Sequence, residues 1–146
     1  MSAAPALRPL RHADASAVLD AFRSAPDMVR QGDVTTPEQA EAYVRRLTEP
    51  GRHVFAVTVA DRLVGSVGVL VDEEDRVGWV WYWMHAAHRG RGWMSAAVAT
   101  VADWALTAGG CERGKFLIAG ERVDVLTYGR LVTDPVPGGP RLLLTR

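Results

Sequence analysis

The sequence predicts an α+β fold, an α/β three-layer architecture in which a mixed, mostly antiparallel central sheet is flanked by helices. Two observations support this prediction. Runs rich in β-branched and aromatic residues, which are typical of strands, follow one another between residues 53 and 85 with only short turns between them. Patterns with the three- and four-residue spacing of an amphipathic helix lie before and after these runs. Strands joined by tight turns pair antiparallel, and the helices can then cover the sheet.

Length and composition indicate one ordinary globular domain. The chain has 146 residues, of which 48% are hydrophobic and 23% are charged. Its formal net charge is zero, which argues against a non-specific nucleic-acid binder. The single cysteine excludes an internal disulfide, and we find no signal peptide and no apolar run of membrane length. We therefore expect a cytoplasmic protein with neither a nucleic-acid nor a membrane partner.

The N-terminal part is expected to hold one edge strand and two helices. Leu7–Leu10 predicts a short strand, and its proline favours an edge position. Asp14 can cap the first helix. The second helix has a clearer start, because Thr36 stands at the cap, Pro37 at the first helical position and Gln39 three residues after the cap.

Three antiparallel strands are expected next. His53–Ala60 and Leu63–Val71 form a hairpin, and an acidic turn, Asp72–Asp75, leads from it into Val77–His85. This turn is most simply a solvated loop, although it could attract a cationic amine. In the third run, tryptophans at positions 79, 81 and 83 alternate with apolar or aromatic residues at 80, 82 and 84. Both faces are apolar, as expected for a strand covered on both sides.

The turn after this strand has the composition of an anion-binding loop. It reads His88-Arg89-Gly90-Arg91-Gly92, and a helical pattern from Met94 to Ala108 follows it directly. The first backbone N–H groups of a helix are unpaired and carry partial positive charge. Glycines allow close backbone approach, and the arginines add charge, so these parts predict a pyrophosphate cradle. The alternative is an exposed turn with solvated arginines, but the long strand before it and the helix after it favour the cradle.

These residues also resemble a family signature. Arg89-Gly90-Arg91-Gly92-Trp93-Met94 resembles the Arg/Gln-x-x-Gly-x-Gly/Ala coenzyme A signature of the GNAT acetyltransferases, with methionine at the last position. The stretch YWMHAAHRGRGWMSAAVATVADWAL is similar to the branch related to ribosomal-protein N-terminal acetyltransferases. The resemblance extends from about Leu7 to Thr133. It implies acetyl-CoA as cosubstrate, and transfer of its acetyl group to a primary amine by direct attack.

The resemblance also implies roles for individual residues. Backbone amides around Trp83 and Met84 would bind the pantetheine arm and polarise the thioester carbonyl, while the loop from Arg89 and the helix start would hold the pyrophosphate. For the amine's proton, His85 is the nearest titratable group with a suitable pKa and Tyr82 is a second candidate, although packing explains each equally well. The expected cofactor-binding residues are Trp83, Met84, Arg89, Gly90, Arg91, Gly92, Trp93, Met94 and Ser95.

The acceptor is expected to be an amine of low pKa. At pH 7 roughly 10% of an α-amine is neutral, against about 0.04% of a lysine side chain. The Trp-rich strand contains no carboxylate that could act as a strong base. Both points favour a protein N-terminus or a small-molecule amine over a lysine. His85 and His88 have a spacing that two zinc ligands could use, but no third ligand is evident. We therefore expect no metal.

The C-terminal part departs from the family pattern. There a fifth strand, usually parallel to the Trp-rich strand, and a fourth helix precede a final hairpin. Here Gly114–Val125 already resembles that hairpin, so about 25–30 residues are missing between Arg113 and Gly114. The Trp-rich strand would then become an edge, covered by the hairpin moved inward, by a partner chain or by aggregation. We therefore expect a homodimer, with one domain over residues 1–133 and a Pro/Gly-rich tail over 134–146, in which Thr133–Pro140 is expected to be loose.

Two alternatives to the enzyme remain open at this point. A truncated acetyltransferase with weak or no catalysis could act as a coenzyme A-binding or oligomer-forming domain. A nucleic-acid module could use the arginines together with the tryptophan row as a base-stacking platform, although a row of this kind in a central strand is more often buried core.

Overall fold

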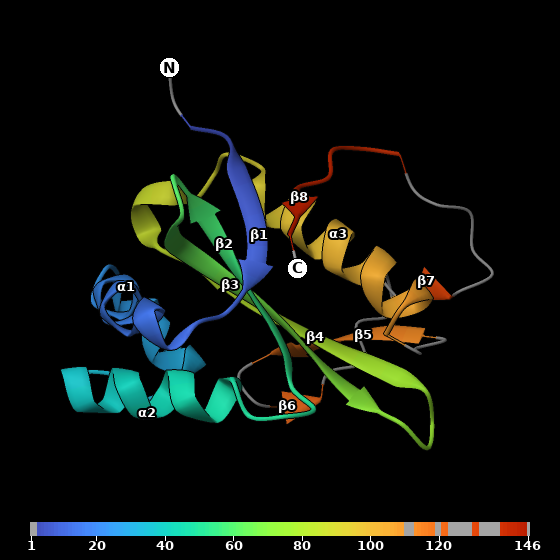
Figure 1. The fold of residues 1–146 in the computed structure, drawn as a ribbon, viewed down its shortest axis with the longest axis horizontal. Coiled ribbons are helices and arrows are strands. Elements are labelled where there is room, and N and C mark those ends of the chain that lie inside the picture. Colours follow the sequence, from blue (N-terminus) through green and yellow to red (C-terminus); the bar gives the residue numbers. More distant parts are fainter. Residues whose placement is uncertain (1–2, 110–112, 119–120, 123–129, 132–137, 146) are drawn as a thin grey trace.

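The described residues form one mixed sheet with helices on both faces, so the predicted fold class is confirmed (Figure 1). The computed structural model describes residues 3–109, 113–118, 121–122, 130–131 and 138–145. The order of the strands in the sheet is β6-β5-β4-β3-β2-β1-β8, and β7 also pairs with β5. The helices are α1 (Ala15–Phe22), α2 (Pro37–Leu47) and α3 (Trp93–Thr107), with short 3₁₀ turns η1 (His12–Asp14), η2 (Pro26–Gln31) and η3 (Ala86–His88).

The three predicted antiparallel strands are confirmed. They are β2 (His53–Val59), β3 (Arg62–Asp72) and β4 (Val77–Met84), and each pairs antiparallel with the next. The β2–β3 turn places Ala60 and Asp61 at φ of 49° and 63°. Positive φ at both central residues is typical of the two-residue turns that match strand twist.

The start of α2 is also as predicted. The Gln39 N–H donates to the Thr36 hydroxyl (3.2 Å), and the Thr36 N–H donates to the Gln39 side-chain oxygen (3.1 Å). Asp14 precedes α1, but its side chain does not cap that helix. Its carboxylate instead accepts hydrogen bonds from the buried Arg8 guanidinium (2.7 and 2.8 Å) and from the Arg11 N–H (2.8 Å). The capping prediction fails there because a buried arginine takes the carboxylate.

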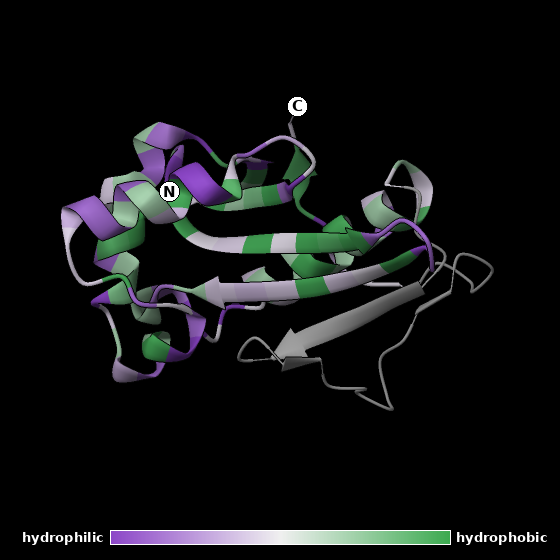
Figure 2. Ribbon diagram, turned by 90° about the horizontal axis from the view of Figure 1, so that it is seen from below, coloured by the Kyte–Doolittle hydropathy of each residue, from purple (hydrophilic) through white to green (hydrophobic). Residues whose placement is uncertain are grey.

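Alternate side chains of β4 enter the two layers, as the sequence pattern predicts. Trp83 packs in a core with α1 and α2, whereas Val80 and Met84 pack in a second core beneath α3. Figure 2 shows hydrophobic positions along the strands and hydrophilic positions on the outer surfaces of the helices. Tyr82 is an exception, because 44% of it is exposed. Within the described residues, we find no helix with the length and apolar character needed to cross a membrane.

The segment predicted to be a final hairpin occupies the position of a fifth strand. β5 (Arg113–Ile118) runs parallel to β4, with Val77–Val80 opposite 113–116, and turns back into β6 (Glu121–Arg122). The expected absence of a fifth strand is therefore wrong, because β5 lies beside β4. Of the three covers expected for the β4 edge, pairing with this segment of the same chain is the one that the structure shows. In the described part of the chain no helix follows α3. The β4–β5 ladder ends at Val80, so residues 81–84 lie beyond it.

The last described residues return to the N-terminal strand. β8 (Leu143–Leu144) pairs parallel with β1 (Pro5–Pro9), and the Thr145 N–H donates to the Leu7 carbonyl (2.9 Å). These residues lie beyond Thr133–Pro140, the segment expected to be loose, and β8 covers part of the expected β1 edge. Residues 134–137 and the single cysteine, Cys111, lie outside the described residues. The short β7 (Arg130–Leu131) pairs with β5.

Candidate functional site

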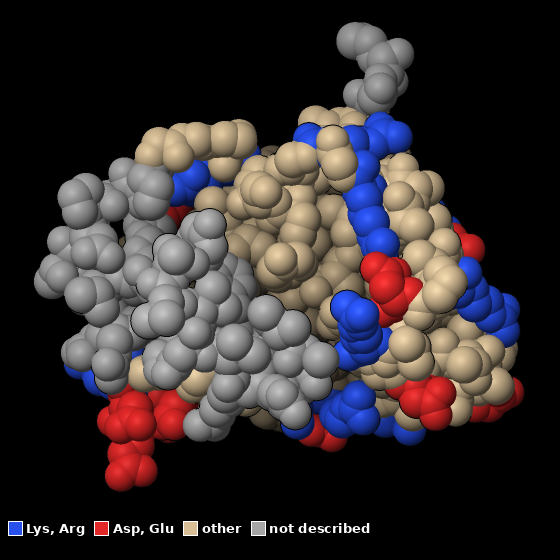
Figure 3. All heavy atoms as spheres, turned by 180° about the vertical axis from the view of Figure 1, so that it is seen from behind, with Lys and Arg blue, Asp and Glu red and all other residues tan. Residues whose placement is uncertain are grey.

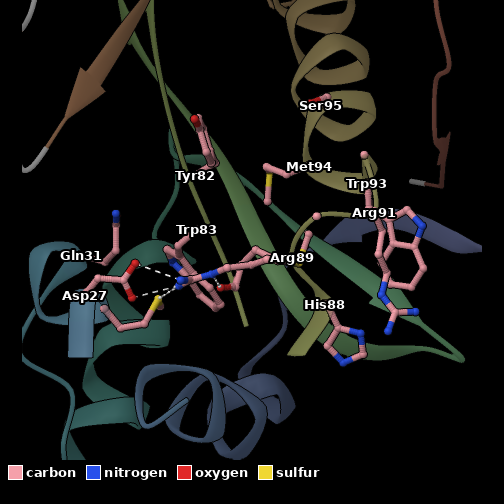
Figure 4. A pocket seen from close by; sticks show the side chains of 14 residues that line it. Asp27, Gln31, Tyr82, Trp83, His88, Arg89, Arg91, Trp93, Met94 and Ser95 are labelled. Carbon is pink, nitrogen blue, oxygen red and sulfur yellow. Dashed lines mark hydrogen bonds and ion pairs between the residues drawn. The ribbon is translucent and has the colours of Figure 1, made fainter. Parts of the chain in front are cut away.

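A cleft of about 430 Å³ opens where β4 ends and α3 begins. Its walls come from the end of β4, the loop at 88–92, the first turn of α3 and the 3₁₀ turn η2. Figure 4 shows these elements around the opening. Every residue that the sequence predicts to bind cofactor lines this cleft, together with Tyr82. The lining residues are Asp27, Met28, Gln31, Tyr82, Trp83, Met84, His88, Arg89, Gly90, Arg91, Gly92, Trp93, Met94 and Ser95.

The loop before α3 has the geometry of an anion cradle. Gly90 and Gly92 have φ of 75° and 76°, in the left-handed region that favours glycine. No heavy atom lies within 4 Å of a Cβ built at either position, so the backbone there is open to a ligand. The first helical bond of α3 runs from the Ala96 N–H to the Gly92 carbonyl (3.1 Å). The N–H groups of residues 93–95 therefore precede the helical ladder, at the positive end of the helix dipole.

The Trp93 ring contacts two side chains beside this loop, those of Arg91 and His88. The Arg91 guanidinium lies 5.0 Å from the centre of the Trp93 ring, and the His88 ring stacks on it at 5.8 Å with an interplanar angle of 24°. Burial lowers the pKa of His88, and the nearby His85 and Arg91 lower it further. His88 is therefore neutral near pH 7, whereas Arg91 adds positive charge at the loop.

Arg89 extends in the other direction, across the cleft to η2 (Figure 4). Its Nε donates to the Met84 carbonyl (3.0 Å), and its two Nη atoms donate to the Asp27 carboxylate (2.9 and 3.1 Å). The hydrogen bond from Arg89 lowers the pKa of Asp27. The sequence predicts Arg89 as part of the cradle; in the structure it lines the cleft but engages a carboxylate and the end of β4.

Trp83 forms a rigid part of the cleft wall. Its indole N–H donates to the Tyr43 hydroxyl (3.1 Å), and its ring meets Phe22 edge-on at 5.4 Å. Burial raises the pKa of Tyr43 to about 12. The β4 residue with the largest side chain in the cleft is thus held from behind by α1 and α2.

The two predicted proton-transfer residues lie in different places. Tyr82 lines the cleft. His85 is not among the lining residues, and both of its ring nitrogens face protein groups: Nδ1 accepts from the Ala87 N–H (3.1 Å), and Nε2 lies 3.4 Å from the Asp20 carboxylate. The structure therefore brings Tyr82, and not His85, together with the predicted cofactor-binding residues.

Sequence reasoning missed the wall formed by η2. Asp27, Met28 and Gln31 lie in a stretch without helical or strand periodicity, so no local pattern marks them. Asp27 and Arg89 are 62 residues apart, and only the fold brings them together. The acidic turn Asp72–Asp75, which the sequence offers as a possible amine attractor, adjoins the opposite end of β4 from the cleft.

The surface around the cleft carries charges of both signs. In Figure 3 basic and acidic side chains lie side by side next to an uncharged hollow. Among the residues that the structure describes, no three His, Cys, Asp or Glu side chains are grouped so that they could hold a metal ion.

Comparison with known proteins identifies the family. A family model of the GNAT acetyltransferase domain matches residues 6–121. Among solved structures, the ribosomal L7/L12 alpha-N-protein acetyltransferase RimL in complex with coenzyme A is similar, with a TM-score of 0.66 and 16% identity over 75% of this chain and 68% of that one.

Two further structures show the same fold. The ribosomal-protein-S5-alanine acetyltransferase from Vibrio fischeri has a TM-score of 0.66 and 20% identity, over 80% of this chain and 73% of that one. The microcin C7 self-immunity acetyltransferase MccE, in complex with acetyl-CoA and AMP, has a TM-score of 0.63 and 12% identity, over 74% of this chain and 65% of that one. A comparison with curated proteins found no match.

Proposed function

Since the chain belongs to the GNAT acetyltransferase family, we propose that it transfers an acetyl group from acetyl-CoA to a primary amine, either a protein N-terminus or a small molecule. One observation supports this most strongly. The residues that the sequence marks for coenzyme A line a single cleft, although they come from a strand, a loop and a helix. The similarity to acetyltransferases of ribosomal-protein N-termini supports an α-amine as acceptor.

The residues present fit the phosphate groups of acetyl-CoA. Gly90 and Gly92 leave the loop backbone open, and the N–H groups of residues 93–95 point out of the helix start. Arg91 supplies positive charge at the same loop. We propose that these groups hold the pyrophosphate, with Trp93, Met94 and Ser95 forming the helix side of the cradle.

The end of β4 is suited to the thioester. Residues 81–84 lie beyond the ladder with β5, so backbone groups of this segment on the side away from β3 are placed to bind the pantetheine arm and to donate to the thioester oxygen. The amine attacks the carbonyl carbon, the N–C bond forms, and the C–S bond breaks. The sulfur takes up a proton as the amine loses one. Tyr82 is the candidate for proton exchange that lines the cleft, and His85 remains a second proposal.

The alternative function is a truncated, weakly active domain that binds coenzyme A or forms oligomers. This alternative was based on the expectation that one wall of the cleft is missing. β5 lies beside β4, so that argument for the alternative is weaker. A homodimer stays a proposal, because two chains could still pair their 81–84 segments. A cytoplasmic location is proposed from the composition, with its single cysteine.

A glycine substitution tests the cofactor assignment. Gly92→Val places a branched side chain at a φ of 76° in the cradle, and we expect it to abolish acetyl-CoA binding measured by isothermal titration while the protein still folds. Gly51→Val is the matched control, because Gly51 also has positive φ (83°) and open surroundings but does not line the cleft. Both variants carry similar backbone strain, of about 1–2 kcal/mol.

Binding and catalysis are tested separately. Thiol release with a panel of amines, read for the unsubstituted protein, tests acetyl transfer itself. A folded Gly92→Val protein with unchanged acetyl-CoA affinity would contradict the cradle. Normal binding without thiol release from any amine would favour the binding-domain alternative.

A further inference from the structure

An ion pair joins two walls of the cleft that are far apart in the sequence. Asp27 comes from η2, and Arg89 comes from the loop after β4. We propose that this pair fixes η2 as the wall against which the acceptor amine binds, so that Asp27 is a positioning residue for the acceptor. The inference rests on the proposed function, because it requires that an amine enters this cleft.

The contacts of Arg89 make it a brace between the two walls. Its guanidinium donates to both oxygens of Asp27 (2.9 and 3.1 Å) while its Nε donates to the Met84 carbonyl (3.0 Å). A third contact reaches the Met28 sulfur at 3.4 Å. A planar guanidinium bound at both edges holds its partners in one orientation, which a lysine could not do. The position of η2 is thereby tied to the last residue of β4.

The other walls of the cleft already have assigned partners. The loop with the start of α3 is proposed to hold the phosphates, and the end of β4 is proposed to hold the thioester. Among the residues that the structure describes, the remaining wall is η2, which contributes Asp27, Met28 and Gln31. An amine that attacks the thioester must approach within the same cleft, so η2 is the described surface that can guide it. A displacement of this wall by about 1 Å can lower a transfer rate by a factor of roughly 100.

Burial of Met28 and a hydrogen bond to Ser24 also hold this segment in place. Met28 anchors η2 from inside, because its side chain is 2% exposed, and the Ser24 hydroxyl accepts from the Ala86 N–H (3.0 Å) just before it. Met28 fixes the depth of the turn, but the Asp27 end is held by the ion pair. Both charged side chains are partly exposed, at 38% for Arg89 and 54% for Asp27, so salt should weaken the pair.

The experiment compares Asp27→Asn with Asp103→Asn. The first variant keeps the shape of Asp27 and removes the charge that Arg89 binds. The second breaks a similar ion pair with Arg141 (2.6 Å) that lies outside the cleft. We would measure acetyl-CoA affinity by titration, the kcat and KM of transfer to an alanine-initiated hexapeptide, and hydrogen exchange of residues 26–31.

The expected results separate positioning from cofactor binding. Asp27→Asn should lower kcat/KM for the peptide roughly tenfold, leave acetyl-CoA affinity within about twofold, and speed exchange in η2. Added salt should reduce kcat/KM in the unsubstituted protein and have little effect in the variant. The reversed pair, Asp27→Arg with Arg89→Asp, should restore slow exchange in η2. Asp103→Asn should match the unsubstituted protein in all of these measurements.

Three outcomes would overturn the proposal. These are unchanged exchange in Asp27→Asn, unchanged peptide kinetics in that variant, or a loss of acetyl-CoA affinity as large as the loss in kcat/KM. If the unsubstituted protein acetylates neither the peptide nor other amines, the proposed function fails, whereas the exchange measurement still decides whether the pair holds η2.

Discussion

Tyr43→Phe tests whether the Trp83 wall depends on support from α2. The substitution keeps the ring, which packs edge-on against Phe22 at 5.3 Å, and removes only the hydroxyl that accepts from the Trp83 indole (3.1 Å). Both residues are buried, with exposed fractions of 7% and 3%. The indole N–H would lose its partner in an apolar layer, which costs about 1–3 kcal/mol. For a chain of this size, each kcal/mol lowers the melting temperature by roughly 2–4 °C.

The same hydroxyl predicts a pH dependence of stability. Burial raises the pKa of Tyr43 to about 12, whereas an unfolded tyrosine loses its proton near pH 10. The folded state therefore favours the neutral hydroxyl, and stability is lost as pH rises from about 10 to 12, by on the order of 2–3 kcal/mol. Tyr43→Phe should lack this loss.

Chemical denaturation at pH 7 and pH 11 measures both effects. Equal stability of Tyr43→Phe and the unsubstituted protein at pH 7, or an equal loss in both at pH 11, would refute the reasoning. Acetyl-CoA affinity, measured in parallel, reports whether a shift of Trp83 reaches the cleft.

The remaining predictions concern the base and the assembly. His85→Ala should lower turnover near neutral pH and recover partly at about pH 9 if His85 takes the amine's proton, because the amine deprotonates unaided there. An equal loss at both pH values would assign His85 a structural role through Ala87 and Asp20. A homodimer formed through residues 81–84 should dissociate when acetyl-CoA is added, because both would use the same backbone. Light scattering that finds a dimer indifferent to acetyl-CoA would place the interface elsewhere.

Features that depend on neighbouring residues were predictable from the sequence. The cap at Thr36, the hairpin between β2 and β3, and the strand–loop–helix around Gly92 each follow from residues close together in the chain. The residues proposed to bind cofactor could be named for the same reason, since Trp83, Met84 and residues 89–95 come from one stretch of the chain, and all of them line the cleft. Neighbouring residues are sufficient to predict the part of the site that is built from the end of β4, the loop at 88–92 and the start of α3.

Features that depend on the whole fold were not predictable. Asp14 has the sequence of a helix cap, but the buried charge of Arg8 competes for its carboxylate, and this burial cannot be seen in the sequence. The Asp27–Arg89 pair joins two loops that no periodic pattern connects. The pairing of β8 with β1 likewise depends on an edge that only the folded sheet presents.

The position of β5 beside β4 is compatible with a cleft at the end of β4. β5 pairs with β4 only over Val77–Val80, and the ladder ends before the residues that line the cleft. The described lining residues all precede Ala96, so the part of the site that the structure describes comes from the chain before β5. β5 supplies a partner for the first half of β4, Val77–Val80, and its ladder does not extend to the end of β4. Acetyl-CoA bound at the end of β4 would therefore not have to displace β5 from this strand.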